Sequence, residues 1–118
     1  MERELPNSNG YTLIPTSVVD ALTQTLTSPA QWYIVMLIMR LTYGTDDEWY
    51  RNGNSFIASY LGRSKRNVRK HLKSLIYRNV IISCGEPGDI KLLKVNEDVE
   101  QWIKRKRGQT AAYETLTK

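Results

Sequence analysis

The residues with the clearest chemical potential are basic side chains concentrated in the middle of the chain. Between residues 49 and 85 the sequence has eight Lys and Arg residues and no Asp or Glu. They are Arg51, Arg63, Lys65, Arg66, Arg69, Lys70, Lys73 and Arg78. Residues 1–48, by contrast, carry six acidic and two basic groups. Cations at this density repel one another, so the pattern predicts a surface that binds a polyanion.

The same segment is amphipathic when it is read as a helix. At about 100° per residue, three apolar residues form one narrow stripe and basic residues fall on the opposite side. The stripe is Val68, Leu72 and Leu75, and the opposite face is Arg66, Lys70, Lys73 and Tyr77. A merely solvated face is the alternative, but such faces usually mix acidic with basic residues, and this one has no acid. We therefore expect it to face nucleic acid.

The sequence contains few residues of the types that usually catalyse reactions or bind metals. The chain has one histidine, His71, and one cysteine, Cys84, which excludes the usual zinc ligand sets and an intramolecular disulfide. We expect no enzymatic activity and no cofactor, with His71 packing between helices and Cys84 buried in a strand. Trp49 and Tyr50 could stack on single-stranded bases, but covering an edge of the core is the favoured interpretation.

Nothing in the sequence indicates a membrane or an export signal. The longest apolar run, residues 32–39, is far shorter than the roughly 20 residues that span a bilayer. A reducing, cytoplasmic location is expected, and no contact with a membrane.

Apolar spacing and capping residues predict four helices. They should cover residues 17–25, 29–41, 56–61 and 65–78. Ser28 and Gln31 are placed to form a capping box around Pro29, and the second helix is apolar nearly all round, as in a central core helix. Gly44 is expected to end that helix in the left-handed conformation.

The second half of the chain predicts a winged helix-turn-helix, a mainly α fold with a small β-hairpin (α+β). Gly62 separates the two short helices, and Ser64 caps the second one. Apolar segments 80–84 and 90–95 then flank a turn-rich loop, which is typical of a hairpin. Asn96 is expected to cap a final helix whose Val99, Trp102 and Ile103 pack on the core.

In this fold the first turns of the second helix enter the major groove, which selects the residues expected to read base edges. Arg pairs with guanine and Asn with adenine. Lysines farther along the helix and on the hairpin are better placed for the phosphate backbone, as are the amides near Ser55 and Ser64. The predicted DNA-binding residues are Ser64, Lys65, Arg66, Asn67, Arg69, Lys70, Lys73, Lys91 and Lys94. The run 104–107 either follows a phosphate backbone or is a charged helix end.

Four segments resemble the N-terminal DNA-binding region of the phage replication protein O family, the lambda-type initiators. They are Gly10-Tyr11-Thr12 with Ile14, Arg40-x-Thr42-Tyr43-Gly44, Ala58-x-x-Leu61-Gly62-x-Ser64, and Asn96-x-Asp98-Val99-x-x-Trp102. The resemblance implies a homodimer that binds repeated double-stranded sites at a phage replication origin. Residues 46–48 are acidic where the family commonly has aromatic and basic residues. Full-length members continue into a region that recruits the host replicative helicase or its loader, so the chain is either an excised domain or a small relative.

The sequence divides into three expected regions. Residues 1–10 are expected to be a flexible terminus, 11–104 the DNA-binding domain and 105–118 a basic, polar tail.

Three interpretations of the function follow from these observations. The favoured function is sequence-specific binding of double-stranded DNA to initiate phage or plasmid replication. A winged-helix transcriptional repressor is the nearest alternative. A module that docks host replication or transcription proteins through the acidic first third is an alternative of another class.

Overall fold

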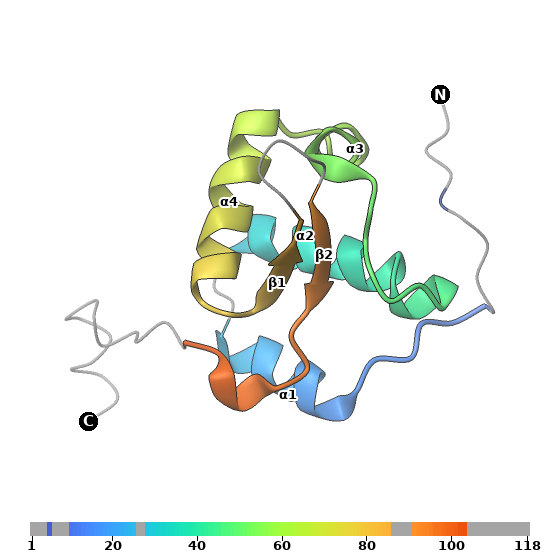
Figure 1. Cartoon of the computed structure of the whole chain (residues 1–118), viewed down its shortest axis with the longest axis vertical. Helices are drawn as coiled ribbons and strands as arrows, with labels where there is room; N and C mark the ends of the chain where they lie inside the picture. The colour runs from blue at the N-terminus through green and yellow to red at the C-terminus, as the bar shows by residue number, and fades with distance from the viewer. Residues whose placement is uncertain (1–4, 6–9, 26–27, 86–90, 104–118) are drawn as a thin grey trace.

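The computed structural model describes residues 5, 10–25, 28–85 and 91–103. The elements, in chain order, are α1 (Thr16–Thr25), α2 (Pro29–Arg40), the 3₁₀ turn η1 (Tyr43–Thr45), α3 (Gly53–Leu61), α4 (Lys65–Tyr77), β1 (Ile81–Cys84), β2 (Leu92–Val95) and the 3₁₀ turn η2 (Val99–Gln101). The other helices pack around α2, and the two-stranded hairpin lies against α4 and α2 (Figure 1). The four predicted helices and the hairpin are thus all present.

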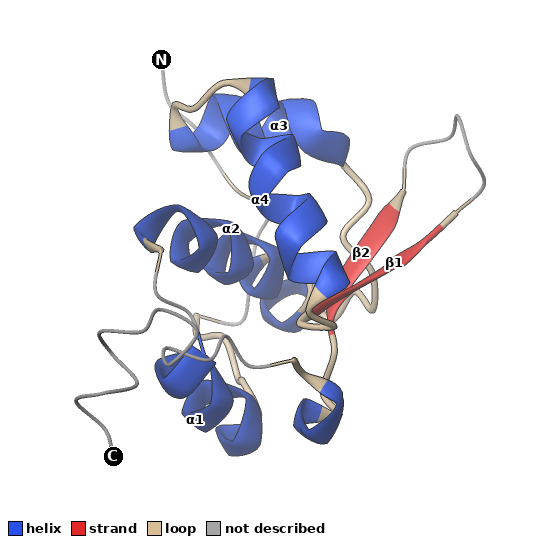
Figure 2. Ribbon diagram, turned by 90° about the vertical axis from the view of Figure 1, so that its left-hand side faces the viewer, coloured by secondary structure: helices blue, strands red, loops and turns tan. Residues whose placement is uncertain are grey.

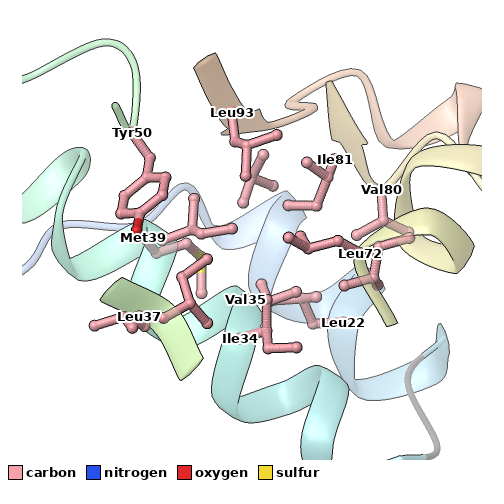
Figure 3. Close-up of a cluster of buried hydrophobic side chains, with 14 of the residues drawn as sticks. Leu22, Ile34, Val35, Leu37, Met39, Tyr50, Leu72, Val80, Ile81 and Leu93 are labelled. Atoms are coloured by element: carbon pink, nitrogen blue, oxygen red, sulfur yellow. The ribbon is translucent and has the colours of Figure 1, made fainter. Parts of the chain in front are cut away.

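The core is built around α2, as its apolar sequence predicts. Ile34, Val35 and Ile38 are fully buried, and α2 contacts α3, α4 and β2. Side chains from α1, α4 and the hairpin, including Leu22, Leu72 and Ile81, meet those of α2 in one continuous apolar cluster (Figure 3). This single core fixes the position of α4 relative to the hairpin.

The turn between α3 and α4 follows the predicted chemistry. Gly62 ends α3 with φ of 69°, a left-handed conformation that glycine adopts at no steric cost. Ser64 then begins α4, and its Oγ accepts a hydrogen bond from the Asn67 amide at 3.0 Å. Such caps stabilise a helix end by about 1 kcal/mol. The result is two short helices joined by a tight turn, with α4 lying across the front of α2 in the side view (Figure 2).

The hairpin is antiparallel, with Ile81 opposite Val95 and Cys84 opposite Leu92. Tyr50 extends this sheet by an isolated bridge to Leu93, in which each residue's amide donates to the other's carbonyl. The Tyr50 ring is buried and its hydroxyl donates to the Gly53 carbonyl at 2.6 Å. The predicted role of Tyr50 in covering the core is therefore confirmed, and the bridge ties the loop before α3 to the wing.

Two expectations about α2 are wrong. Gly44 lies in η1 without a left-handed φ, and α2 already ends at Arg40. A Cβ at Gly44 would come within 2.8 Å of Thr12 Oγ1, so glycine is needed for close approach rather than for a helix stop. The capping box is absent because the Ser28 side chain makes no cap bond and the Gln31 amide bonds to Arg78 and His71 instead.

Two more expectations fail near the end of the chain. In place of the predicted final helix there is the single 3₁₀ turn η2. Of the two residues that follow it, Trp102 is buried and Ile103 is exposed. Asn96 organises this segment differently, since its Oδ1 accepts from the Asp98 amide and its carbonyl accepts from Trp102 Nε1. Cys84 is exposed at the end of β1 rather than buried.

Some sequence-based predictions fall on residues that the structure does not describe. Residues 1–4 and 6–9, the strand start at 90 and the run 104–107 with the rest of the tail lie outside the described residues. The proposed domain limits therefore stay predictions. Leu5, by contrast, is described and packs against the core.

Candidate nucleic-acid interface

The faces of α4 are divided as its sequence predicts. Val68, Leu72 and Leu75 are buried against the core. Five cations of α4 are exposed, and none has a hydrogen-bond or ion-pair partner among the described residues: Lys65, Arg66, Arg69, Lys70 and Lys73. We call these five residues the α4 ridge. An exposed row of uncompensated cations is a binding surface for an anion.

The start of α4 is more constrained than the sequence alone indicates. Ser64 Oγ accepts the bond that caps α4, so this side chain acts first in holding the start of that helix in place. Asn67 is half-buried, and its Oδ1 accepts a hydrogen bond from Arg63 Nη1 at 3.2 Å. Arg63 in turn lies over the Tyr33 ring, 5.8 Å from its centroid. Asn67 Oδ1 therefore has one lone pair already used and its orientation constrained by Arg63, which weakens the prediction of a two-bond contact to adenine.

A hollow of about 720 Å³ lies where α3, α4 and the hairpin meet. Four cations line it: Lys65, Arg69 and Lys73 from α4 and Lys91 from the hairpin. The first residues of α3, Gly53, Asn54 and Ser55, form another wall. The structure thus brings Lys91 together with the α4 ridge, from a part of the chain well separated in sequence.

The N-terminus of α3 adds amide donors to this hollow. Asn52 precedes the helix and makes no side-chain cap bond, and the first turn contains no acidic residue. The first amides of a helix lack intrahelical partners and carry a partial positive charge. Together with the four cations, they form an environment suited to a phosphate group.

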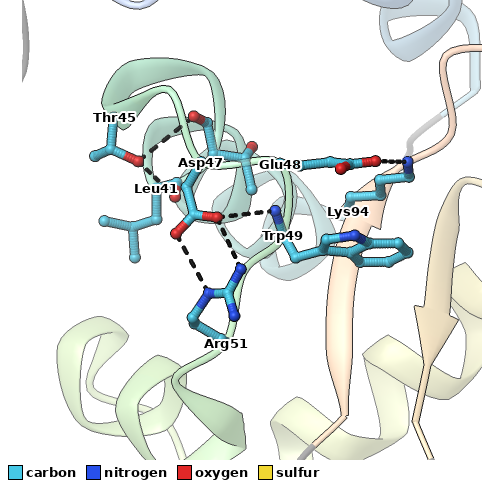
Figure 4. A network of polar contacts seen from close by, with 8 residues as sticks. Leu41, Thr45, Asp47, Glu48, Trp49, Arg51 and Lys94 are labelled. Atoms are coloured by element: carbon cyan, nitrogen blue, oxygen red, sulfur yellow. Dashed lines mark hydrogen bonds and ion pairs between the residues drawn. The ribbon is translucent and has the colours of Figure 1, made fainter.

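Lys94, in contrast, lies away from the α4 ridge. Its Nζ forms an ion pair with Glu48 Oε2 at 2.9 Å and sits 4.6 Å from the centroid of the Trp49 ring (Figure 4). It lines a different hollow, which contains several acidic residues. The predicted DNA-binding residues are therefore brought together except for Lys94.

Tyr77 belongs to the ridge face but was not included in the predicted site. Its side chain is 77% exposed and lines a shallow hollow with Arg66, Lys70 and Lys73. The signal was present in the sequence, since Tyr77 falls on the same side of the helix as these cations. A large exposed aromatic residue with a hydroxyl can contact both sugar and phosphate.

Arg78 and Arg51 contribute less to this surface than the charge count indicates. Arg78 is only 7% exposed and bonds to the carbonyls of Thr25 and Ile103. Arg51 is paired with Asp47 at 3.1 Å, an interaction that also lowers the pKa of that carboxyl group. The exposed cations of the basic segment that have no ion-pair partner among the described residues are therefore those of α4.

The other chemically notable side chains have structural surroundings. His71 Nδ1 lies 3.4 Å from Gln31 Nε2, between α4 and α2. Its pKa is lowered by burial and by the nearby Lys70 and Arg63 charges. Within the described part of the chain, no group of three His, Cys, Asp or Glu residues could hold a metal ion. No helix of that part has the length and apolar character needed to cross a bilayer.

A helix-turn-helix whose second helix displays cations, followed directly by a hairpin, defines a winged helix-turn-helix protein of the DNA-binding class. The expected fold class is confirmed. Residues 5–102 match the family of bacteriophage replication protein O, and the chain belongs to that family. The suspected resemblance is confirmed, and it places the chain among proteins of phage replication. Curated protein sequences give no match.

Several solved structures have a similar backbone arrangement. The adhesin competence repressor AdcR from Streptococcus pyogenes has a TM-score of 0.47 and 23% identity, over 86% of this chain and 69% of that one. ZitR from Lactococcus lactis has a TM-score of 0.47 and 21% identity, over 95% of this chain and 64% of that one. RV1404 from Mycobacterium tuberculosis has a TM-score of 0.47 and 12% identity, over 87% and 67%. Likenesses at this level say nothing about what this chain binds.

Proposed function

We propose that the protein binds specific double-stranded DNA sites, repeated at a phage replication origin, as a step in starting replication. The observation that supports this most directly is the α4 ridge, five exposed cations without an acidic partner among the described residues. Membership in the replication protein O family supports the replication role. The protein is then a binding protein of the host cytoplasm rather than an enzyme.

The length of α4 fits this proposal. Thirteen residues at about 1.5 Å each extend for about 20 Å, whereas the major groove is about 12 Å wide. The first half of the helix can therefore lie in the groove while its last turn reaches the groove edge. Arg66, Arg69 and Lys70 then face bases, and Tyr77 faces the sugar-phosphate backbone.

The hollow between α3, α4 and the hairpin supplies contacts that do not depend on sequence. Lys73 and Lys91, with the first amides of α3, would hold one phosphate of the strand beside the groove. Such contacts fix the register of α4 on the duplex. Base-reading residues can discriminate only when that register is fixed.

Two partners complete the proposal. Two-fold related or iterated sites require two copies of the protein, so a homodimer on DNA is expected. The family resemblance also implies cooperation with the replicative helicase or its loader. Light scattering with and without a duplex site, and pull-down of the replicative helicase or its loader by this protein, test these two statements separately.

Footprinting on the parent phage genome tests the function. Several copies of one protected sequence clustered in a replication origin are expected. A single protected operator at a promoter would instead identify a transcriptional regulator. Uniform, salt-sensitive coverage without preferred sites would contradict sequence-specific binding.

Charge reversal tests the surface. The double variant Arg66→Glu/Lys70→Glu should lose specific protection, because both cations lie on the exposed face of α4. Arg51→Glu, a single charge reversal at an exposed position in the loop before α3, controls for added negative charge outside the ridge and should retain it. Retained protection in the double variant would exclude the α4 ridge as the DNA-binding surface.

A further inference from the structure

A second hollow, of about 700 Å³, is formed by segments that do not include α3 or α4. We call it the acidic groove and define it by Tyr11, Leu13, Tyr43, Asp46, Glu97 and Asp98. The segment that follows α2, which forms one wall, lies on the side of the molecule opposite to α4 (Figure 1). The groove and the α4 ridge are therefore separate surfaces.

The charges around the groove are mostly negative and only partly compensated. Glu48 is neutralised by Lys94, and Asp47 by Arg51 (Figure 4). Asp46 and Asp98 are exposed and have no basic partner among the described residues. Glu97 accepts a hydrogen bond from the Tyr43 hydroxyl at 2.8 Å, which leaves its charge in place. Burial and this carboxylate both raise the pKa of Tyr43, so the hydroxyl stays a donor.

The groove also exposes apolar surface. Leu13 is 71% and Tyr11 62% exposed, although both are large side chains. The half-buried Ile82 and the buried Val95 of the hairpin also line the hollow. Large exposed apolar side chains beside charged groups are typical of a surface that contacts another protein.

We propose that the acidic groove binds a cationic segment of another protein, with an apolar side chain held against Tyr11 and Leu13. Charge complementarity selects this occupant, because Asp46, Glu97 and Asp98 repel DNA and attract Lys and Arg. No residue of α4 lines the groove, so the protein can bind this segment while α4 lies on a duplex. The protein thereby connects DNA on one side to a basic partner on the other.

The test uses the full chain and a defined probe. The probe is a short fluorescein-labelled peptide of alternating Lys and Leu, and the same peptide with Glu in place of Lys is the charge control. Fluorescence anisotropy at low ionic strength should show binding of the Lys peptide and none of the Glu peptide. No difference between the two peptides would overturn the proposal.

Paired variants locate the binding. Asp46→Asn/Asp98→Asn should weaken binding of the Lys peptide about fivefold, as expected for two exposed ion pairs. Asp20→Asn/Glu100→Gln removes the same charge from exposed positions outside the groove and should change binding by less than about twofold. Leu13→Ser, at an exposed position that should not affect folding, should also weaken binding. Equal binding by all variants would show non-specific attraction and overturn the proposal.

Two further measurements separate this proposal from other outcomes. Sedimentation of the wild type and of Asp46→Asn/Asp98→Asn should give the same mass, and loss of a dimer in the variant would show that a second copy occupies the groove. The same variant should keep the duplex affinity of the wild type. A wild type that binds the Lys peptide but no duplex would refute the proposed function and leave the groove assignment standing.

Discussion

Lys91 and Lys94 show how strongly a single side chain depends on its neighbours. Both lysines were predicted to contact phosphate from the hairpin. Lys91 lines the hollow beside α4 with three other cations, whereas Lys94 is paired with Glu48 and lies over Trp49. The sequence could not distinguish them, because Glu48 and Trp49 are more than forty positions away from Lys94.

This difference gives a prediction for the alanine variants of the two lysines. Lys91→Ala should weaken binding to all duplex sequences and lower the slope of affinity against salt concentration by about one. Lys94→Ala should leave both quantities close to those of the wild type. Titrations of specific and random duplexes at several salt concentrations measure the slopes, and a larger effect at Lys94 would contradict the assignment.

The exposed arginine and lysine of the first turns of α4 should behave differently from Lys91. Arg66→Ala or Lys70→Ala should cost about 1–3 kcal/mol on the specific site and relax the preference for it. Competition between the specific duplex and base-substituted duplexes measures this preference. Equal losses on specific and random DNA would show that these residues contact only the backbone.

His71 gives a prediction about pH. Its pKa in the folded protein is below the ordinary value of 6.5, because burial and two nearby cations disfavour the charged ring. The unfolded chain therefore binds a proton more readily, so the free energy of unfolding should be highest above pH 6.5 and fall as pH is lowered through the folded pKa. In His71→Gln this part of the pH dependence should be absent from urea titrations at pH 7 and below.

Among the helices, the start of α4 depends on one hydroxyl. Ser64→Ala removes the acceptor for the Asn67 amide and should lower the free energy of unfolding by about 1 kcal/mol. Ser59→Ala, at an exposed position inside α3, is the control and should have little effect. Urea denaturation measures both, and a neutral Ser64→Ala would show that the cap does not stabilise α4.

Local sequence signals predicted α4 and its surroundings well. The apolar stripe, the Ser64 cap and the left-handed Gly62 all act within one or two helical turns, so the sequence alone contains the necessary information. The same is true of the hairpin, whose strands begin one and two residues later than predicted and end where predicted. The fold class and the α4 ridge were therefore predictable.

Contacts between distant segments account for the errors. The sequence predicts that Gln31 caps its own helix. Its side-chain amide instead bonds to His71 in α4 and to Arg78 at the C-terminal end of α4. The segment after Asn96 was expected to be helical, but the bond from Trp102 Nε1 to the Asn96 carbonyl holds it as one 3₁₀ turn. The apolar lining of the acidic groove combines Tyr11 and Leu13 with Ile82 and Val95, which lie far along the chain, and no local pattern shows this.

At the scale of the whole molecule, the exposed cations of the α4 ridge differ from Arg78, which is buried and bonded within the fold. Arg78 Nη2 donates to the Thr25 carbonyl, Nη1 to Gln31 Oε1 and Nε to the Ile103 carbonyl. Arg78, at the C-terminal end of α4, therefore connects that helix to α1, to α2 and to Ile103, the last described residue.

This distinction predicts opposite effects for two arginines in one helical region. Arg78→Gln should lower the free energy of unfolding by more than about 2 kcal/mol, since it removes charged hydrogen bonds to buried carbonyls. Arg69→Gln should leave stability nearly unchanged and reduce DNA affinity. Urea denaturation and duplex titration of both variants check the crossed pattern, and a stable Arg78→Gln would contradict it.

The bonds of Arg78 also bear on how the native state fluctuates. Because one guanidinium bonds to both Thr25 and Ile103, and α1 also contacts η2 directly, opening of either segment removes contacts from the other. Their amides should then exchange with deuterium at a common rate, as one cooperative opening unit, while the amides of α2 in the core exchange more slowly. The segments α1 and η2, which are far apart along the chain, would then open together.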